Sequence, residues 1–397
     1  MSSLKRAVYR VIGESTLYRG KRVLRKWLSG RKNVDTALAY RTISVGHHTS
    51  CGYYDWDPVR DGTLLLTASD KRLRKATVCG VDLATLETRP MAETVAVNWQ
   101  QGCRLRWVAE NRLLYNDFQG GQYVCVEVAD GEERVHPYPV YDATAEVAVS
   151  LDFERLGRLR PGYGYTLRGD HAAIGPETAA MRVYRVRDDA LLAEIPYRAL
   201  MDALALSVKL DACYVNHVSF SPDGSQFLFF FVEIVGGRHL CRMGVYRMES
   251  GKIAFAETAL SVSHYTWKDA HTILATAYDD RRRCGYYLYT LPGMSRETVM
   301  PDKLKQDGHP TYINPGQFIT DTYPDAAGYQ ELRLVTPERD EVRVLARLYS
   351  TARHLGENRC DLHPRYSARA QAVFVDADIR GRRKVYQFDW KTGEEQA

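Results

Sequence analysis

The chain has 397 residues, 45% of them hydrophobic, and a formal net charge of +5. No stretch approaches the roughly 18 consecutive apolar residues of a membrane-spanning helix, and no apolar segment with a cleavage site opens the chain, so we expect neither a span nor a secretory signal. The eight cysteines are scattered without a CxxC pair, which argues against a zinc ribbon or disulfide framework and predicts reduced thiols in the cytoplasm.

The basic charge is concentrated at the start of the chain. Residues 1–33 carry ten Lys and Arg side chains against one acid, Glu14, a net of +9 that leaves −4 for the rest. Apolar residues such as Trp27 are interleaved with these cations, and we predict a basic helical extension over residues 1–40. It could be a solvated or partner-docked tail, or contact the anionic surface of the inner membrane through residues 1–33. Nucleic acid is the least favoured alternative, and we expect no such partner.

From residue 41 onward, short apolar runs alternate with turn residues such as Pro222-Asp223-Gly224. Little helix is expected outside the tail, except near 197–210. The pattern predicts an all-β fold, a seven-bladed β-propeller over residues 41–397, in which residues 41–46 complete the last blade and remove an exposed edge. The seven units are 47–92, 97–137, 139–197, 216–258, 262–298, 307–348 and 361–395.

Four histidines recur near the starts of the last four units, at positions 217, 264, 309 and 363, in steps of 47, 45 and 54 residues. Each is followed three residues later by an aromatic residue: Phe220, Trp267, Tyr312 and Tyr366. Because equivalent positions of propeller blades lie around one axis, we expect the four imidazoles to face a central funnel. A repeated structural histidine, bonded to a backbone carbonyl, is the alternative.

The last histidine has oxygen donors close by in sequence. Asp361 lies two residues before His363, which on a strand would turn both side chains to the same face, and Asn358 precedes them. A mixed nitrogen and oxygen set suits Mn, Fe, Co, Ni or Zn better than Mg or Ca. This segment therefore is a candidate metal site.

Arginines and aromatic residues are candidates for a sugar site. The irregular segment FERLGRLRPGYGY (153–165) supplies Arg158, Arg160, Tyr163 and Tyr165, and arginine forks match carboxylates while tyrosines stack on sugar rings. A structural loop is the equal alternative. Further candidates for substrate binding lie at strand starts, in the repeat and in a loop: Tyr53, Tyr54, Trp99, Trp267 and Arg238. The strand-start residues could equally belong to core turns.

Several catalytic signatures are missing from the chain. There is no GxSxG, GxxxxGK[ST], GxGxxG opening a helix, or HExxH, which argues against a serine hydrolase, an NTPase and a Rossmann oxidoreductase. A propeller glycosidase needs no short motif and stays open, with Asp321, Asp325 or Glu233 as its carboxylates.

The segments SFSPDG, SHYTW, GHPTYINPG, TDTYPD and RCDLHPRYS together resemble the oligogalacturonate lyases, seven-bladed propellers related to the TolB-type propellers. The resemblance covers residues 47–395 as an architecture and is most specific over 216–395. It implies a metal-assisted lyase that acts by β-elimination on a uronic-acid-containing oligosaccharide or polysaccharide, in surface polysaccharide metabolism.

The resemblance also implies roles for individual residues. A divalent metal, typically manganese, would be bound by His309 and His363, with Asp361 in place of a third histidine and Asn358 in place of a glutamine. The catalytic set would consist of His264 as the proton-abstracting base, His217, Arg158 and Arg160. The two replacements favour a competing interpretation, a non-catalytic glycan-binding or scaffold propeller beside a membrane-side glycan assembly system.

Overall fold

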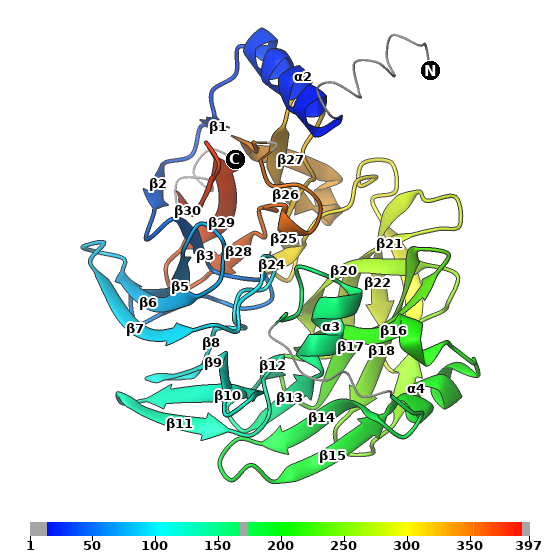
Figure 1. Ribbon diagram of the computed structural model, residues 1–397. Coiled ribbons are helices and arrows are strands. Elements are labelled where there is room, and N and C mark those ends of the chain that lie inside the picture. The colour runs from blue at the N-terminus through cyan, green and yellow to red at the C-terminus, as the bar shows by residue number, and fades with distance from the viewer. Residues whose placement is uncertain (1–13, 167–173, 352, 391–397) are drawn as a thin grey trace.

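The computed structural model describes residues 14–166, 174–351 and 353–390. Seven antiparallel sheets form a ring around one axis, and helix α2 (Glu14–Ser29) stands at its edge (Figure 1). The predicted all-β, seven-bladed propeller is therefore confirmed. The first thirteen residues of the predicted basic extension lie outside the described part of the chain.

The first three blades follow the predicted units closely. Blade one has the strand order β3-β5-β6-β7, with β4 paired to β5. Blade two has the order β11-β10-β9-β8, and blade three has the order β12-β13-β14-β15. Their strands are β3 (His48–Ser50), β4 (Val59–Arg60), β5 (Thr63–Ser69), β6 (Ala76–Asp82), β7 (Thr88–Thr94), β8 (Arg106–Ala109), β9 (Arg112–Gln119), β10 (Gln122–Ala129), β11 (Glu132–His136), β12 (Asp142–Ala143), β13 (Val147–Leu151), β14 (Ala179–Arg185) and β15 (Leu191–Pro196).

The last four blades contain the histidine repeat. Their strands are β16 (Cys213–Phe220), β17 (Gln226–Val235), β18 (Arg238–Arg247), β19 (Ile253–Phe255), β20 (Ser261–Asp269), β21 (Thr272–Tyr278), β22 (Cys284–Thr290), β23 (Ser295–Val299), β24 (Thr311–Asn314), β25 (Gln317–Asp321), β26 (Tyr329–Thr336), β27 (Glu341–Tyr349), β28 (Arg365–Ser367), β29 (Ala372–Ile379) and β30 (Arg382–Asp389).

The sequence of each strand reflects its depth in the blade. The middle strand β17 reads QFLFFFVEIV and is buried over its first seven residues, because neighbouring blades cover both of its faces. Outer strands such as β23, SRETV, are mostly exposed and polar. The first strands of successive blades contact one another, as β20 does β24 and β24 does β28, so they surround the central channel.

Strands from the start of the chain complete the last two blades. β2 (Tyr40–Ile43) pairs antiparallel with β30, with Tyr40 opposite Phe388 and Ile43 opposite Val385. This is the predicted ring closure, shifted by about one residue from 41–46. A further strand, β1 (Val34–Thr36), adds a fifth strand to blade six by pairing with β27, which the sequence did not indicate.

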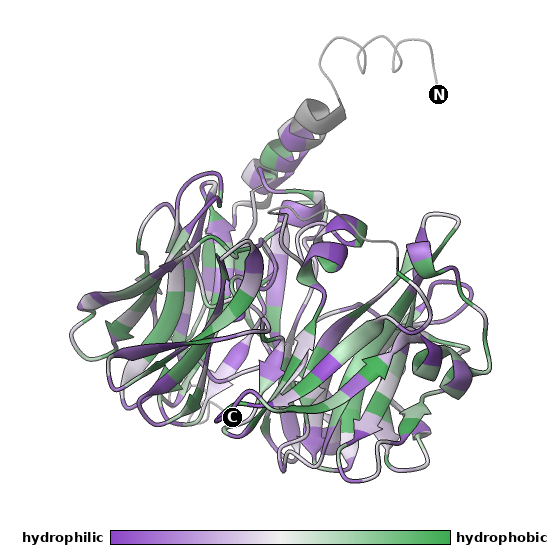
Figure 2. Ribbon diagram, turned by 60° about the horizontal axis from the view of Figure 1, so that its bottom comes forward, coloured by the Kyte–Doolittle hydropathy of each residue, from purple (hydrophilic) through white to green (hydrophobic). Residues whose placement is uncertain are grey.

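Helices are few and lie outside the sheets. α2 (Glu14–Ser29) projects from the ring, as Figure 2 shows, and α4 (Tyr197–Leu204) occupies the predicted helical segment after blade three. Short 3-10 turns occur at η1 (Leu210–Ala212), η2 (Pro337–Arg339) and η3 (Gly356–Asn358). No helix of the described ranges has both the length and the apolar character needed to cross a bilayer.

The insertion in blade three contains an unpredicted helix, α3 (Phe153–Leu159), which begins where the Asp152 side chain accepts a hydrogen bond from the Arg155 backbone. The chain then folds back against this helix. A Cβ atom on Gly157 or Gly164 would overlap the backbone of the opposing segment, so the two glycines permit this close approach. The fold-back brings Tyr163 next to His217, with 5.6 Å between the ring centroids.

Candidate functional site

The four repeated histidines meet at one end of the central channel. The ring centroid of His309 lies 3.9 Å from that of His264 and 4.4 Å from that of His363. The ring of Tyr53 is stacked on His217 at 5.0 Å between centroids, and it meets His363 edge-on at 4.9 Å. The spacing predicted from the sequence therefore does bring the four imidazoles together, with Tyr53 buried among them.

Irregular backbone directs these side chains into the channel. His217 and His264 lie within β16 and β20 at breaks in the strand register, and His217 has a left-handed φ of 55°. His363, just ahead of β28, has a φ of 46°. Left-handed backbone costs a residue with a Cβ about 1–3 kcal/mol, and bulges re-aim side chains near functional sites. The strain indicates that the direction of these imidazoles matters.

Two of the histidines are held by buried carboxylates. Nδ1 of His309 lies 2.8 Å from Oδ1 of Asp321, and the backbone N–H of His309 donates to the same oxygen. Nδ1 of His264 lies 3.0 Å from Oδ1 of Asp307. An ionised carboxylate can only accept, so each Nδ1 carries the hydrogen, and in the neutral imidazole the free lone pair is on Nε2.

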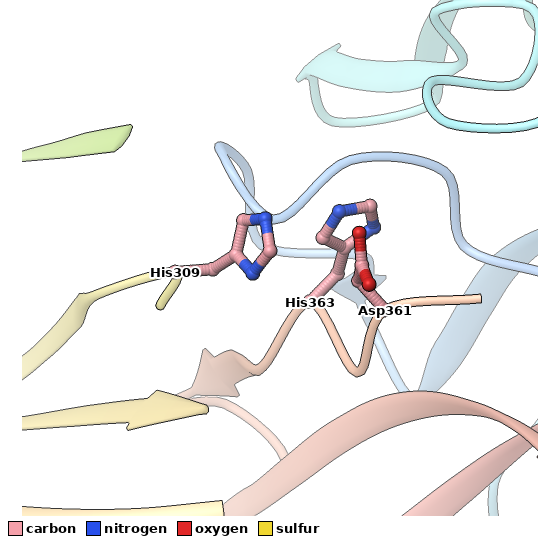
Figure 3. Close-up of side chains that lie close together, drawn as sticks. All are labelled: His309, Asp361 and His363. Carbon is pink, nitrogen blue, oxygen red and sulfur yellow. The ribbon is translucent and has the colours of Figure 1, made fainter. Parts of the chain in front are cut away.

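Three donor groups form a candidate metal site. One ligand atom each of His309, Asp361 and His363 lies within 4.8 Å of the others, and Figure 3 shows the two rings and the carboxylate side by side. Nε2 of both histidines is buried without a hydrogen-bond partner in the part of the chain that the structure describes. The carboxylate–histidine arrangement at His309 is the usual support of a metal-binding imidazole, so the residues fit a divalent transition metal.

The geometry differs from the predicted one in two respects. Asp361 and His363 are not on a strand: they lie in the irregular segment before β28, and backbone bending rather than strand alternation brings them together. Both oxygens of Asp361 also accept hydrogen bonds from Arg359, at 2.5 and 2.8 Å. Asn358 lies in η3, where its backbone oxygen accepts from Arg383 and its buried side-chain oxygen has no hydrogen-bond partner among the described residues.

Burial and neighbouring charges set the protonation of the histidines. Burial, and then the other histidines and nearby arginines, lower the pKa of His217 and His363 well below the usual range. Burial and the neighbouring His309 lower the pKa of His264. Burial also disfavours a charge on His309, but Asp321 and Asp361 outweigh it and raise its pKa.

A cavity of about 620 Å³ opens beside the histidines. His217 and His264 line it together with the predicted Arg160, Tyr163 and Arg238. Residues not singled out from the sequence also line it: Arg282, Arg359, Tyr323, Tyr214 and His239.

The charge of this cavity favours an acidic ligand. Arg160, Arg238 and Arg282 line it and form no ion pair with any residue in the described ranges. Its acids are largely engaged: Asp307 contacts His264, and Asp279 pairs with Arg283 at 2.7 Å, which leaves Asp280. Three available guanidinium groups therefore face one unpaired carboxylate.

Several predicted residues lie elsewhere. Arg158 is exposed on α3 and does not line the cavity. Tyr165 is in the core, stacked on Phe153 at 4.7 Å, and its hydroxyl accepts from Asn116. The Tyr54 hydroxyl donates to the backbone oxygen of Tyr265 and accepts from its N–H, so the tyrosine fastens two blades together.

The two tryptophans also lie away from the cavity. Trp99 packs 5.4 Å from both His48 and His354, where the first and last blades meet. Trp267 donates to the backbone oxygen of Ser219 and lines a separate hollow of about 240 Å³. That hollow collects all four aromatics of the repeat, namely Phe220, Trp267, Tyr312 and Tyr366. The aromatic residues that follow each repeated histidine by three positions therefore form a second cluster, separate from the histidines.

The carboxylates considered for a glycosidase are engaged in other contacts. Asp321 accepts from His309 and from the backbone N–H of His363. Glu233 pairs with Arg242 at 3.2 Å, and Asp325 accepts from two backbone N–H groups in its own loop. None of the three presents a free carboxyl group to the cavity lining.

Sequence reasoning missed the groups that support the histidines. Asp307 lies two residues before His309 as Asp361 lies two before His363, so a repeated Asp-x-His pattern was a usable signal. Arg359 had no such signal, because its role depends on folding back onto Asp361. The same is true of Tyr323, whose ring lies 4.3 Å below the Arg359 guanidinium.

Fold and site together define a class: a seven-bladed propeller with the fold of the oligogalacturonate lyases and a histidine-lined funnel. An oligogalacturonate lyase in complex with manganese overlays 90% of this chain and 95% of its own, with a TM-score of 0.63 and 14% sequence identity. An oligogalacturonate lyase from Vibrio parahaemolyticus overlays 91% of this chain and 98% of its own, with a TM-score of 0.60 and 12% identity.

Other proteins share the propeller as one part of a longer chain. A puromycin-hydrolysing peptidase from Mycobacterium tuberculosis overlays 89% of this chain but 56% of its own, with a TM-score of 0.52 and 12% identity. No protein-family model matches this chain, and no curated protein matches it in sequence. The predicted resemblance is thus confirmed for the fold, and the fold alone does not decide the chemistry.

Proposed function

We propose that this protein is a cytoplasmic, metal-assisted lyase that cleaves uronic-acid-containing oligosaccharides or polysaccharides by β-elimination. One observation carries the proposal: two buried imidazole nitrogens without partners lie next to a cavity in which three arginines have no ion pair among the described residues. Donor atoms for a metal and cations for a carboxylate therefore occupy one funnel. The likeness to the oligogalacturonate lyase in complex with manganese supports the same assignment.

His309, His363 and Asp361 would hold the metal. Asn358, whose buried side-chain oxygen has no partner among the described residues, is kept as a fourth candidate from the sequence. Bound there, a divalent cation such as manganese would act as a Lewis acid on the sugar carboxylate and stabilise charge on the adjacent carbon. Asp321 fixes the tautomer of His309 from behind. Arg359 pairs with both oxygens of Asp361, so it competes with the metal for this carboxylate, and it adds a cation at the mouth of the site.

His264 is placed to act as the base. Its lowered pKa keeps the imidazole neutral at physiological pH, and Asp307 occupies Nδ1, so Nε2 is the proton acceptor. Asp307 stays ionised, because contacts to His264 and to the Thr276 and Ser263 hydroxyls lower its pKa despite its burial. The carboxylate then stabilises the imidazolium that forms.

The reaction balances without an oxidant or a reductant. His264 accepts the proton from the carbon α to the carboxylate, and the electron pair of that bond forms a double bond to the neighbouring ring carbon. The bond from that carbon to the glycosidic oxygen breaks, and the departing oxygen takes up a proton. The products are one new hydroxyl end and one unsaturated uronate.

The remaining cavity residues bind and orient the sugar chain. Arg160 and Arg238, predicted for this role, face the cavity together with Arg282, and guanidinium forks pair with carboxylates in two hydrogen bonds. Tyr163 offers a ring face and a hydroxyl, and burial keeps that hydroxyl protonated by raising its pKa. His217 lines the same cavity and is neutral.

The test combines metal content with product chemistry. We would measure metal by inductively coupled plasma mass spectrometry and the ultraviolet absorbance of unsaturated uronate from polygalacturonate and other uronate glycans. Wild type should carry about one equivalent of transition metal, and His309→Ala should lose both metal and activity, on the order of 10³-fold or more. His264→Ala should keep the metal and lose the activity. His271→Ala, an exposed histidine of blade five, is the matched control.

A second function rests on the contacts of Arg359. Because this guanidinium satisfies both oxygens of Asp361, the same funnel could bind an acidic glycan without a metal, as a scaffold or accessory protein. Absence of metal after incubation with excess ions, together with retained binding of uronate glycans, would favour this function over the lyase. Reducing ends without unsaturated sugar would instead indicate a glycosidase.

A further inference from the structure

The second half of helix α2 turns four apolar residues away from the protein. Trp27 is 77% exposed, Leu28 68%, Val23 60% and Leu24 56%. A surface helix of a globular protein normally packs its apolar stripe against the core and leaves its charges in water. Here the arrangement is inverted, so this face of the helix has no partner within the described protein.

The inward face of the helix is basic and is fixed to blade six. Arg22 is only 3% exposed and lies so close to Gly328 that a Cβ at that glycine would come within 2.8 Å of its Nε. Nζ of Lys26 lies 4.9 Å from the ring centre of Tyr349, and the Tyr329 hydroxyl donates to the backbone oxygen of Arg31 at 3.0 Å. These contacts hold the helix with its apolar residues outward.

Charge and aromatic content indicate what covers this face. Arg19, Lys21 and Arg25 are exposed on the helix, within a segment of net charge +9. A second copy of the chain would bring the same positive charge against itself. Nucleic acid would match the cations and leave the tryptophan and leucines in water. An anionic lipid surface satisfies both, because its headgroups pair with the cations and its interface accepts Trp and Leu side chains.

The helix sits on the rim from which the histidine funnel opens. The loop between β25 and β26 begins with Thr322 and Tyr323 and ends at Gly328 beneath Arg22. Tyr323 lines the funnel cavity and also a neighbouring groove of about 850 Å³, whose lining extends to Tyr329. One continuous surface therefore leads from the funnel to the segment that follows the helix.

We propose that α2 is a peripheral membrane anchor. The face formed by Val23, Leu24, Trp27 and Leu28 enters the interface of an anionic bilayer, and the funnel rim lies next to the lipid headgroups. The anchor then gives the funnel access to acidic ligands at the membrane surface. This inference depends on the helix and its contacts, and it does not require the funnel to have lyase activity.

Sedimentation of the full chain with vesicles tests the anchor. We expect binding to phosphatidylcholine vesicles that contain phosphatidylglycerol, little binding to phosphatidylcholine alone, and weakening with added salt. The double substitution Leu24→Glu with Trp27→Glu should reduce the partition coefficient at least about tenfold. Leu191→Glu with Leu192→Glu, at the exposed apolar pair of β15, should leave it unchanged.

Hydrogen exchange with and without vesicles tests the orientation. Residues 279–283 and 322–328 on the funnel rim should gain protection, and residues 56–58 beside the aromatic hollow should not. Failure of wild type to bind anionic vesicles, equal binding by the charged double variant, or protection of the aromatic side alone overturns the proposal. A wild-type dimer that the double variant dissociates, without vesicle binding, would assign the face to self-association instead.

Discussion

The two walls of the central channel use polar residues differently. On the wall from blades one to three, two buried arginines have carboxylate partners: Arg104 pairs with Asp55 at 2.8 Å, and Arg106 pairs with Asp142. On the wall from blades four to seven, His309 and His363 each retain a buried nitrogen without a partner in the described chain. The first wall therefore neutralises its buried charges, while the second keeps two imidazole nitrogens available to a ligand, at some cost because an unpaired buried polar group is destabilising.

The largest expected effect lies on the first wall. Asp55→Asn leaves the buried Arg104 charge without its counter-ion, which should lower the free energy of unfolding by about 3–5 kcal/mol. Metal content should not change, because neither residue belongs to the candidate metal site. Chemical denaturation together with elemental analysis checks both statements, and loss of metal without loss of stability would erase the contrast between the walls.

On the second wall, Asp321→Asn removes the carboxylate that orients His309. Metal affinity should fall about 10- to 100-fold, as it does when other outer carboxylates are removed from metal-binding histidines. Competition with a fluorescent chelator measures the change. Asp340→Asn is the matched control, since Asp340 is exposed and its left-handed backbone tolerates Asn. Equal affinity in both variants would contradict the supporting role of Asp321.

The substitution Arg359→Gln tests the metal-binding capacity of the second wall further, because it removes the guanidinium that bonds to both oxygens of Asp361. Metal affinity should rise several-fold while KM for an acidic glycan also rises, since a cation is lost from the cavity mouth. Arg238→Gln, further along the same cavity, should raise KM without changing metal affinity. A fall in metal affinity for Arg359→Gln would show that the arginine supports the site rather than competing for it.

A smaller effect is expected where the ring closes. Burial, and then His354 and His47, lower the pKa of His48 to about 4 from its usual 6.5. The unfolded chain therefore takes up a proton at a pH where the folded chain does not, and stability should fall as the pH drops from about 6.5 to 4, by roughly 1–2 kcal/mol.

His48→Asn tests this dependence. An amide oxygen can still accept from the backbone N–H of Arg383, as Nδ1 of His48 does at 3.3 Å, but it cannot titrate. Urea unfolding at pH 7 and pH 5 should show a smaller difference for the variant than for wild type. An unchanged difference would place the pH dependence in other groups.

The sequence predicted the propeller well because the pattern that indicates a blade occurs repeatedly along the chain. Apolar runs and turns recur seven times, and the histidine spacing follows the blade length, so errors in single strands do not change the architecture. The residues that tune the site were harder to predict. Arg359 reaches Asp361 through a local fold-back, and Tyr165, in the same short motif as Tyr163, turns into the core. Composition and spacing do not show which of two nearby tyrosines faces the cavity and which faces the core.

The pairing of β1 with β27 and of β2 with β30 has a consequence for folding. Both strands precede every other strand that the structure describes, yet their partners lie more than 300 residues later in the chain. Contacts of such long sequence separation form slowly, and a strand that waits for its partner is exposed to mispairing. We therefore expect the ring to close last during folding, so that chains lacking blade seven would present β2 as an open edge and aggregate.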